Sequence, residues 1–176
     1  PGVSVRVTDD DDQAVADGTV GQLQVKGDNV FRGYWRLPDK TAEEFSADGW
    51  FRTGDQARRD ASGYLSIVGR SKDMVITGGY NVYPKEVESV IDALDGVLES
   101  AVIGLPHADF GEMVTAVVVP QAGGPPLDEQ HIIRTLKSRL AGYKVPKRVF
   151  FTDALPRNTM GKVQKNRLRE TYAEQC

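Results

Sequence analysis

Apolar and polar residues alternate through most of the first part of the chain. The segments Ser4–Thr8 and Val20–Lys26 have the two-residue period of a half-buried strand. The segment Gln56–Val68 is predicted to form a hairpin around a central Asp-Ala-Ser-Gly turn. A short helix capped by Asp39 is predicted over Asp39–Phe45. This part is therefore expected to be β-rich, either a meander or part of a barrel.

The pattern changes near Lys72, where strand-like and helix-like segments begin to alternate. Apolar residues recur at helical spacing between Pro84 and Leu94, and Asp128 is a plausible N-cap for another helix that Gly142 ends. The remaining predicted elements are strands at Ser100–Leu105, Val114–Val119 and Lys147–Thr152, a turn-rich connection at Pro106–Glu112, and a terminal helix at Asn166–Tyr172. The second part is therefore predicted to be a small α+β domain of two or three strands with helices packed on them.

The segment Gly69–Pro84 joins these two parts. It contains three charged residues, Arg70, Lys72 and Asp73, followed by a short apolar strand and the pair Gly78-Gly79. Glycine adopts backbone angles that other residues resist, so a tight turn is expected at this pair. We interpret the segment as a hinge, with a domain boundary near Lys72.

Composition narrows the class of protein. The chain has 176 residues, of which 40% are hydrophobic and 27% charged, as in globular proteins. No apolar run approaches the roughly 20 residues of a membrane-spanning helix. The net charge of −3 makes general nucleic-acid binding unfavourable. The single cysteine, Cys176, excludes an internal disulfide framework and fits a reducing compartment.

Charge is distributed unevenly along the chain. Between Lys144 and Arg169 there are eight Lys or Arg residues and one acid, Asp153. This excess favours an anionic partner, and the alternative is a basic face that contacts only solvent. The acidic run Asp9–Asp12 is interpreted as a solvated turn.

The chain lacks the familiar self-contained catalytic sets. Neither His107 nor His131 has a cysteine cluster nearby, and there is no Gly-x-Ser-x-Gly elbow or phosphate-binding Gly-x-x-x-x-Gly-Lys-Ser/Thr loop. No metal ligand is predicted. The remaining candidate is Lys162, which directly follows a polar loop bracketed by Pro156 and Gly161. A mobile ammonium group there suits the charge that develops on a phosphate under attack. The alternative is an ordinary exposed lysine.

Four motifs occur in an order and spacing that resemble the adenylate-forming superfamily of acyl-CoA synthetases, peptide-synthetase adenylation domains and firefly luciferase. They lie at residues 50–55, 69–73, 78–88 and 156–162. The amino-acid sequences of residues 75–86 and 156–166 are similar to the corresponding segments of malonyl-CoA synthetases. The resemblance implies that residues 1–71 end a large N-terminal domain with a β-rich, barrel-like subdomain. Residues 72–176 would then be a small, mobile C-terminal α+β domain.

The resemblance also implies roles for particular residues. Lys162 would be catalytic, bridging the substrate carboxylate and the α-phosphate of ATP. Asp55 and Arg70 would hold the ribose of ATP or AMP, and Lys72 would be the hinge of a domain rotation between half-reactions. The loop Gly78-Gly79-Tyr80 would line the channel for the pantetheine of CoA.

The implied function is that of the C-terminal portion of an acid–CoA ligase in fatty acid metabolism. With ATP and Mg²⁺ it would activate a small carboxylic acid, malonate or methylmalonate, and then transfer the acyl group to CoA. The phosphate-binding segment and acyl pocket belong to an N-terminal domain upstream of Pro1, so this chain is expected to be inactive alone. A cytoplasmic location is expected, with an organelle left open because the chain starts without an initiator methionine.

Two alternatives remain at this point. One is a peptide-synthetase-type adenylation domain that loads a carrier protein instead of CoA. The other is a non-catalytic interaction module that retains the fold.

Overall fold

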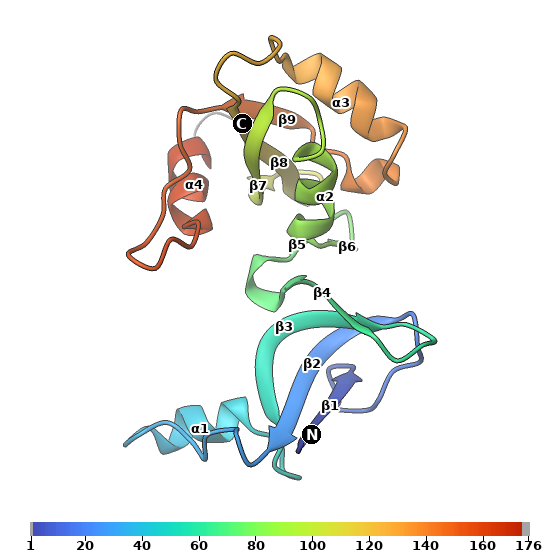
Figure 1. Cartoon of the computed structure of the whole chain (residues 1–176), viewed down its shortest axis with the longest axis vertical. Helices are drawn as coiled ribbons and strands as arrows, with labels where there is room; N and C mark the ends of the chain where they lie inside the picture. Colours follow the sequence, from blue (N-terminus) through green and yellow to red (C-terminus); the bar gives the residue numbers. More distant parts are fainter. Residues whose placement is uncertain (1, 174–176) are drawn as a thin grey trace. The chain divides into compact units, whose positions relative to one another are not determined.

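The chain folds into two compact units, Pro1–Lys72 and Asp73–Cys176. The computed structural model describes residues 2–173 (Figure 1), so Cys176 lies outside the described residues. Both units combine helices with sheets, which confirms the α+β class.

The first unit is an antiparallel sheet of four strands that are neighbours in chain order. These strands are β1 (Val3–Thr8), β2 (Val20–Gly27), β3 (Phe51–Arg59) and β4 (Leu65–Arg70). The predicted strands and the β3–β4 hairpin are confirmed. Its small core contains Val7, Leu23 and Ala57. Helix α1 (Pro38–Glu44) is inserted between β2 and β3.

The start of α1 differs from the prediction. The N-cap is Leu37, and no side chain caps the helix, so the predicted cap at Asp39 is wrong. Pro38 occupies the first helical position, where its fixed φ suits the helix and its missing N–H leaves no donor to satisfy. Asp39 lies inside the first turn.

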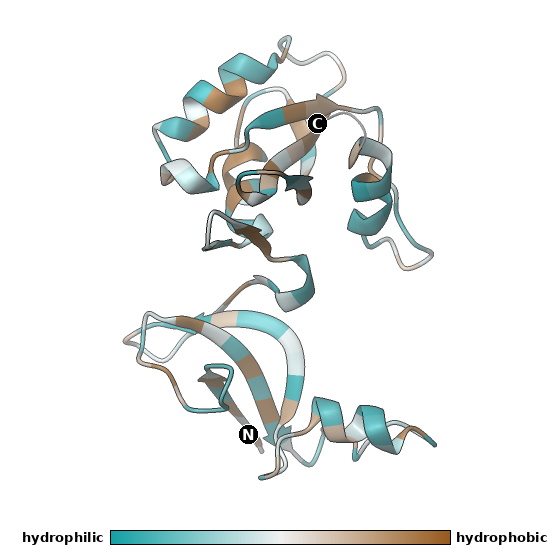
Figure 2. Ribbon diagram, turned by 180° about the vertical axis from the view of Figure 1, so that it is seen from behind, coloured by the Kyte–Doolittle hydropathy of each residue, from teal (hydrophilic) through white to brown (hydrophobic). Residues whose placement is uncertain are grey.

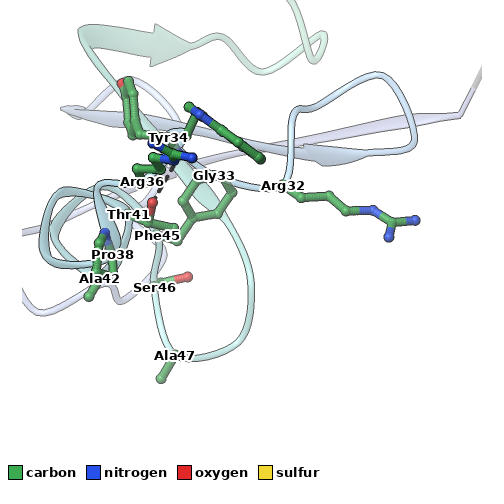
Figure 3. Close-up of a pocket in the computed structure, with 11 residues that line it drawn as sticks. Arg32, Gly33, Tyr34, Arg36, Pro38, Thr41, Ala42, Phe45, Ser46 and Ala47 are labelled. Atoms are coloured by element: carbon green, nitrogen blue, oxygen red, sulfur yellow. Dashed lines mark hydrogen bonds between the residues drawn. The ribbon is translucent and has the colours of Figure 1, made fainter.

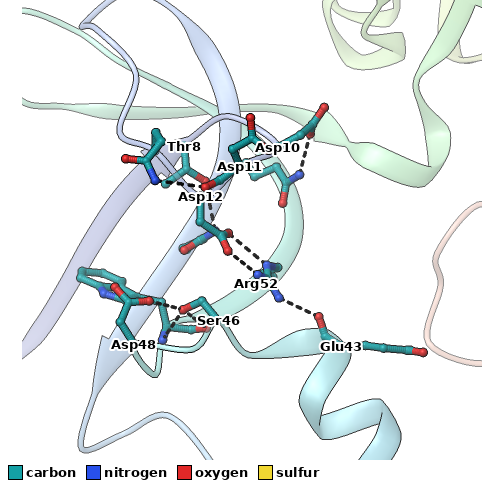
Figure 4. A network of polar contacts seen from close by, with 12 residues as sticks. Thr8, Asp10, Asp11, Asp12, Glu43, Ser46, Asp48 and Arg52 are labelled. Atoms are coloured by element: carbon teal, nitrogen blue, oxygen red, sulfur yellow. Dashed lines mark hydrogen bonds and ion pairs between the residues drawn. The ribbon is translucent and has the colours of Figure 1, made fainter.

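Three of the four residues in the acidic run Asp9–Asp12 lie in a solvated turn, as predicted. Asp9, Asp10 and Asp11 are exposed, but Asp12 is half-buried in a polar network, which corrects the prediction for that residue (Figure 4). The Asp12 carboxylate accepts hydrogen bonds from Arg52 on β3 and from the buried Gln24 on β2. This network ties the turn between β1 and β2 to β3.

The Asp12–Arg52 contact predicts a pH-dependent stability. The hydrogen bond from Arg52 holds the pKa of Asp12 below its ordinary value, although burial opposes this shift. A depressed carboxyl pKa stabilises the fold above the unfolded pKa of about 3.9 and ceases to do so as pH falls through the folded pKa. We expect Arg52→Gln to lower the unfolding free energy of the first unit by about 1–2 kcal/mol at pH 7. The difference from the unchanged chain should shrink below about pH 4.

Urea unfolding followed by tryptophan fluorescence measures this effect, because Trp35 and Trp50 both lie in the first unit. The matched control is Arg59→Gln, which removes an exposed pair with Asp17 and is expected to cost at most about 1 kcal/mol. A destabilisation by Arg52→Gln that stays constant from pH 7 to pH 3 would contradict the prediction.

The second unit contains a five-stranded sheet in which β8 is central. The strands are β5 (Val75–Thr77), β6 (Tyr80–Val82), β7 (Val97–His107), β8 (Gly111–Pro120) and β9 (Arg148–Phe151). The order is β6-β5-β8-β7, and β9 pairs in parallel with β8. The predicted two or three strands were too few, because the short β5–β6 hairpin belongs to this sheet. The connection predicted at Pro106–Glu112 is largely strand, since β7 and β8 continue into it.

Helices cover both faces of this sheet. Helices α2 (Pro84–Ile91) and α3 (Glu129–Lys137) pack on the core that includes Val102, Ala116 and Val118. The alternate positions of β7 and β8, including Ile103 and Val117, pack on the other side with α4 (Lys165–Tyr172). Apolar colouring is accordingly concentrated in the strands and on the inward helix faces (Figure 2). Burial on both faces explains why these strands are continuously apolar in sequence.

Two helices end earlier than their apolar patterns suggested. Helix α2 ends at Ile91, and α3 ends at Lys137. Leu94 and Leu140 still pack against the core from the segments that follow. Gly142 therefore does not end α3 but begins a separate 3₁₀ turn, Gly142–Lys144.

The start of α3 agrees with the prediction. The carboxylate of Asp128 accepts a hydrogen bond from the backbone N–H of His131 at 2.9 Å, which confirms the predicted N-cap. Within residues 2–173, no helix is both long enough and apolar enough to cross a membrane.

Candidate functional site

A bulge in β3 presents Asp55. In the pairing of β2 with β3, Gln22 faces Gln56 and Gln24 faces Arg52, so the segment Thr53–Asp55 lies opposite Leu23 alone. Gly54 has φ +74°, which a residue with a side chain adopts at a cost. The Thr53 hydroxyl donates to the Leu23 carbonyl at 2.9 Å and accepts from the Asp55 N–H at 3.1 Å. Bulges of this kind redirect a side chain out of a regular ladder.

The structure brings the two predicted ribose-binding residues together. Asp55 and Arg70 are cross-strand partners on β3 and β4, and Arg70 Nε lies 3.0 Å from Asp55 Oδ1. The Asp55 side chain is 22% exposed and that of Arg70 is 47% exposed. The pair therefore forms a fixed but accessible carboxylate with a cation beside it.

Both neighbours of Lys72 are held, each within its own unit. The Gln56 side-chain amide donates to the Ser71 hydroxyl at 2.7 Å, and Gln56 is buried. On the other side, Arg169 Nη2 of α4 lies 3.9 Å from Asp73 Oδ1. Lys72 itself is exposed, in a 3₁₀ turn over Ser71–Asp73. The tethered neighbours leave Lys72 as the point where the backbone passes from one unit to the other.

Gly78 and Gly79 form the two-residue turn between β5 and β6. Thr77 faces Tyr80 across the turn, and the two glycines have φ +55° and +80°. A two-residue hairpin turn with positive φ at both positions is of type I′, which favours glycine. A Cβ at Gly79 would meet nothing within 4 Å. Within this unit, glycine is therefore favoured at the turn by the backbone conformation and not by a lack of space for a side chain.

The ring of Tyr80 stacks on Tyr143, with the ring centroids 4.7 Å apart. Tyr80 is 59% exposed and Tyr143 37% exposed, so the stacked pair forms an aromatic surface beside the Gly78-Gly79 turn. Sequence reasoning missed Tyr143. Its place after Gly142 in a turn carried no signal, because the contact depends on how the 3₁₀ turn packs against β6.

Lys162 lies on a closed hairpin. Arg157 and Val163 form a bridge, and the Asn158 side-chain oxygen accepts from the N–H groups of Met160 at 3.0 Å and Lys162 at 2.9 Å. Arg157 also pairs with Glu99 on β7. The sequence predicted a polar loop here, and the structure shows that this loop is a hairpin closed by these contacts. The Lys162 side chain is exposed at the end of a fixed support.

Most of the basic segment is neutralised inside the second unit. Five of its eight cations form ion pairs: Lys144 with Glu86, Arg148 with Glu129, Arg157 with Glu99, Lys165 with Glu88, and Arg169 with Asp73. In the part of the chain that the structure describes, Lys147, Lys162 and Arg167 are exposed and have no ion-pair partner. The basic face expected from the sequence is therefore mostly neutralised by acids of the same unit.

A hollow in the first unit does not contain the predicted site residues. It lies beside α1 and is lined by Arg32, Tyr34, Trp35, Thr41 and Phe45 among others (Figure 3). Neither Asp55 nor Arg70 lines it. The candidate residues are therefore identified by their motifs and pairing and not by a cavity.

Comparison with known proteins supports the motif reading. Residues 86–162 match the family model of the AMP-binding enzyme C-terminal domain. Over 97% of its length, the chain is 48% identical to the 3-[(3aS,4S,7aS)-7a-methyl-1,5-dioxo-octahydro-1H-inden-4-yl]propanoyl:CoA ligase of Rhodococcus jostii, of which it covers 31%. It is 47% identical, over 93% of its length, to a long-chain-fatty-acid–CoA ligase of Mycobacterium tuberculosis, of which it covers 32%.

A solved structure agrees over nearly the whole chain. The crystal structure of ATP-bound MatB from Rhodopseudomonas palustris matches 99% of this chain with a TM-score of 0.93 and 59% identity, and 35% of that protein is covered. The chain thus spans about a third of the length of the curated relatives it matches. The motifs, the fold and these relatives agree: residues 86–162 belong to the AMP-binding enzyme C-terminal domain family, within a chain that is similar over nearly its whole length to acyl-CoA ligases.

Proposed function

We propose that this chain is the C-terminal portion of an acid–CoA ligase that forms an acyl-adenylate from ATP and then a CoA thioester. Residues 1–71 would complete the large domain, and residues 72–176 would be the mobile domain. The observation that carries the proposal is Lys162, an exposed cation without an ion-pair partner in residues 2–173, on a hairpin that other ion pairs hold in place.

In the first half-reaction, a carboxylate oxygen of the acid attacks the α-phosphorus of ATP. A new oxygen–phosphorus bond forms, and the bond to the bridging oxygen breaks, so that pyrophosphate leaves with the electron pair. The Lys162 ammonium would lie between the carboxylate and the α-phosphate, where it stabilises the negative charge that both contribute. Asp55 would accept hydrogen bonds from the ribose hydroxyls, because an ionised carboxylate has only acceptors to offer. Arg70 keeps that carboxylate in place.

Mg²⁺ would neutralise phosphate charge during this step. Among residues 2–173, no group of three or more His, Cys, Asp or Glu side chains is arranged to hold a metal ion. We therefore assign no Mg²⁺ ligand to this chain.

In the second half-reaction, the CoA thiol loses its proton to solvent and its sulfur attacks the acyl carbon. The bond from that carbon to the AMP oxygen breaks, and AMP leaves with the electron pair. The turn Gly78-Gly79-Tyr80 would contact the pantetheine arm. Two features fit a thin ligand: the open space where Cβ atoms would be at Gly79, and the exposed, stacked ring of Tyr80.

Rotation about Lys72 would allow one domain to serve both half-reactions. Lys72→Pro should reduce the rate of thioester formation more than the rate of adenylation. The two fold-reductions should differ by a factor of at least about ten, which corresponds to about 1.4 kcal/mol. Proline fixes φ near the value of the 3₁₀ turn and so restricts the rotation. Separate single-turnover assays of the two half-reactions in the full-length protein measure this, with Lys72→Ala as the flexible control. Equal losses in both half-reactions would mean that the segment is a linker.

We propose malonate or methylmalonate as the acid. The support is the 59% identity to MatB, a malonyl-CoA synthetase, compared with 48% and 47% to ligases of a fused-ring propanoate and of long-chain fatty acids. The full-length protein should be assayed with ATP, CoA and a panel of malonate, methylmalonate, acetate and palmitate, with pyrophosphate, AMP and thioester as readouts. Preference for palmitate would overturn the substrate assignment.

The same assay tests the two alternatives. Adenylate formation without transfer to CoA would favour a carrier-protein acceptor. Absence of adenylate formation with every acid would favour a non-catalytic module.

A further inference from the structure

The carboxylate of Glu88 connects three elements of the second unit. Glu88 lies on α2 and is 7% exposed. Its Oε1 atom accepts hydrogen bonds from the Val102 N–H of β7 at 2.9 Å and from Lys165 Nζ of α4 at 2.6 Å. The side chains of Lys165 and Glu88 are only 15% and 9% exposed, so this ion pair is largely removed from water.

The position of Lys165 is unfavourable for α4 itself. Lys165 is the first residue of that helix, where the helix dipole disfavours a cation, and no side chain caps the helix. Burying an ion pair also costs desolvation energy that the attraction need not repay. The pair therefore adds little to stability by its presence, but it fixes where α4 begins.

The hairpin that carries Lys162 ends where α4 begins. Lys165 follows Lys162 by three residues, and the Gln164 N–H donates to the Pro156 carbonyl at 2.8 Å across the base of the hairpin. The opposite side of the base is held by the ion pair of Arg157 with Glu99. Glu99 lies on β7, the same strand whose Val102 N–H binds Glu88. Both sides of the hairpin are thus tied to one strand.

We propose that Glu88 is a positioning residue for adenylation, which acts through Lys165 to set the place of the Lys162 ammonium group. This inference rests on the proposed function of Lys162. The backbone N–H of Val102 holds the Glu88 carboxylate at one fixed point. Because Lys165 pairs with that carboxylate, Lys165 and the adjoining hairpin are held in a single position. Without that tie the hairpin retains its internal hydrogen bonds through Asn158 and its Arg157–Glu99 pair, but its Lys165 side can shift relative to β7.

The test is Lys165→Met in the full-length protein, compared with Lys165→Arg, which keeps the charge. Lys165→Met should lower the single-turnover rate of acyl-adenylate formation by about 10- to 100-fold, the scale of a misplaced catalytic group. Thioester formation from preformed acyl-adenylate should stay within about twofold, because Lys162 acts in the first half-reaction alone. Lys165→Arg should recover most of the adenylation rate. The matched control is Arg167→Met, which removes an exposed cation of the same helix and should leave both rates unchanged.

A second variant covers the case in which Lys165→Met does not fold. Glu88→Gln keeps an acceptor for the Val102 N–H and removes the charge, and it should show the same selective loss of adenylation. An unchanged adenylation rate, or an equal loss in both half-reactions, would overturn the positioning role. If the unmodified protein forms no adenylate with any acid, the proposed function fails instead, so the two failures are distinguishable.

Discussion

Lys162→Ala is expected to reduce the rate of acyl-adenylate formation by at least about 100-fold in the full-length protein, a loss of roughly 3 kcal/mol of transition-state stabilisation. The physical reason is that the Lys162 ammonium has no ion-pair partner among residues 2–173, so its charge is available to the reacting phosphate and carboxylate. Its exposed hairpin makes alanine tolerable for folding. Thioester formation from supplied acyl-adenylate should be nearly unaffected.

The matched control is Lys147→Ala, which removes another exposed cation of the second unit. Both half-reactions should remain within about twofold of the unmodified rates, because charges that do not contact substrate act weakly through water. Pyrophosphate release and transfer of the acyl group to CoA are measured separately. Adenylation by Lys162→Ala at a rate near that of the unmodified protein would show that another group carries the charge.

Glu88→Ala is expected to destabilise the second unit by about 3–5 kcal/mol, the usual cost of removing one partner of a buried ion pair. The substitution leaves the largely buried ammonium of Lys165 uncompensated and removes the acceptor of the Val102 N–H. Helix α2 offers a matched control in Glu86, which pairs with Lys144 at 2.7 Å but whose side chain is 40% exposed. Glu86→Ala should cost no more than about 1 kcal/mol.

Native-state hydrogen exchange measures the unfolding free energy of the second unit separately from that of the first unit. The most protected amides of β8, in the centre of the sheet, report the unfolding free energy of the second unit. Equal losses for Glu86→Ala and Glu88→Ala would show that burial does not distinguish the two ion pairs. Glu88→Gln, which keeps an acceptor, should be less destabilising than Glu88→Ala.

Several strands and one of the two predicted helix caps were predictable from local chemistry, whereas the cap predicted at Asp39 was wrong. The alternation of Ser4–Thr8 and Val20–Lys26 and the Asp128 cap needed no tertiary information. Helix ends were less predictable, because Leu94 and Leu140 continue the apolar pattern of a helix yet reach the core from turns. An apolar side chain gains from burial in either conformation, so periodicity alone does not locate the last helical residue.

The candidate site was likewise predictable from the sequence only in part. Motif spacing pointed to Asp55, Arg70 and Lys162, and the register of β3 with β4 then placed the first two side by side. The eight cations near the C-terminus appeared as an open basic face, because the sequence does not show that acids far upstream neutralise most of them. Glu88 and Lys165 are 77 positions apart in the chain.

The sequence by itself determined the family resemblance, the α+β class and most of the elements, and it suggested the residues of the proposed chemistry, because periodicity, turn glycines and motif order are local properties of a chain. Only the tertiary structure decided which charges are paired. An ion pair between distant positions depends on strand order and helix placement, which bring Glu88 of α2 to the start of α4 beside β7. For that reason Lys162 was recognisable as a candidate from its motif, whereas its exposed, unpaired charge and the fixed hairpin beneath it became visible only in the folded unit.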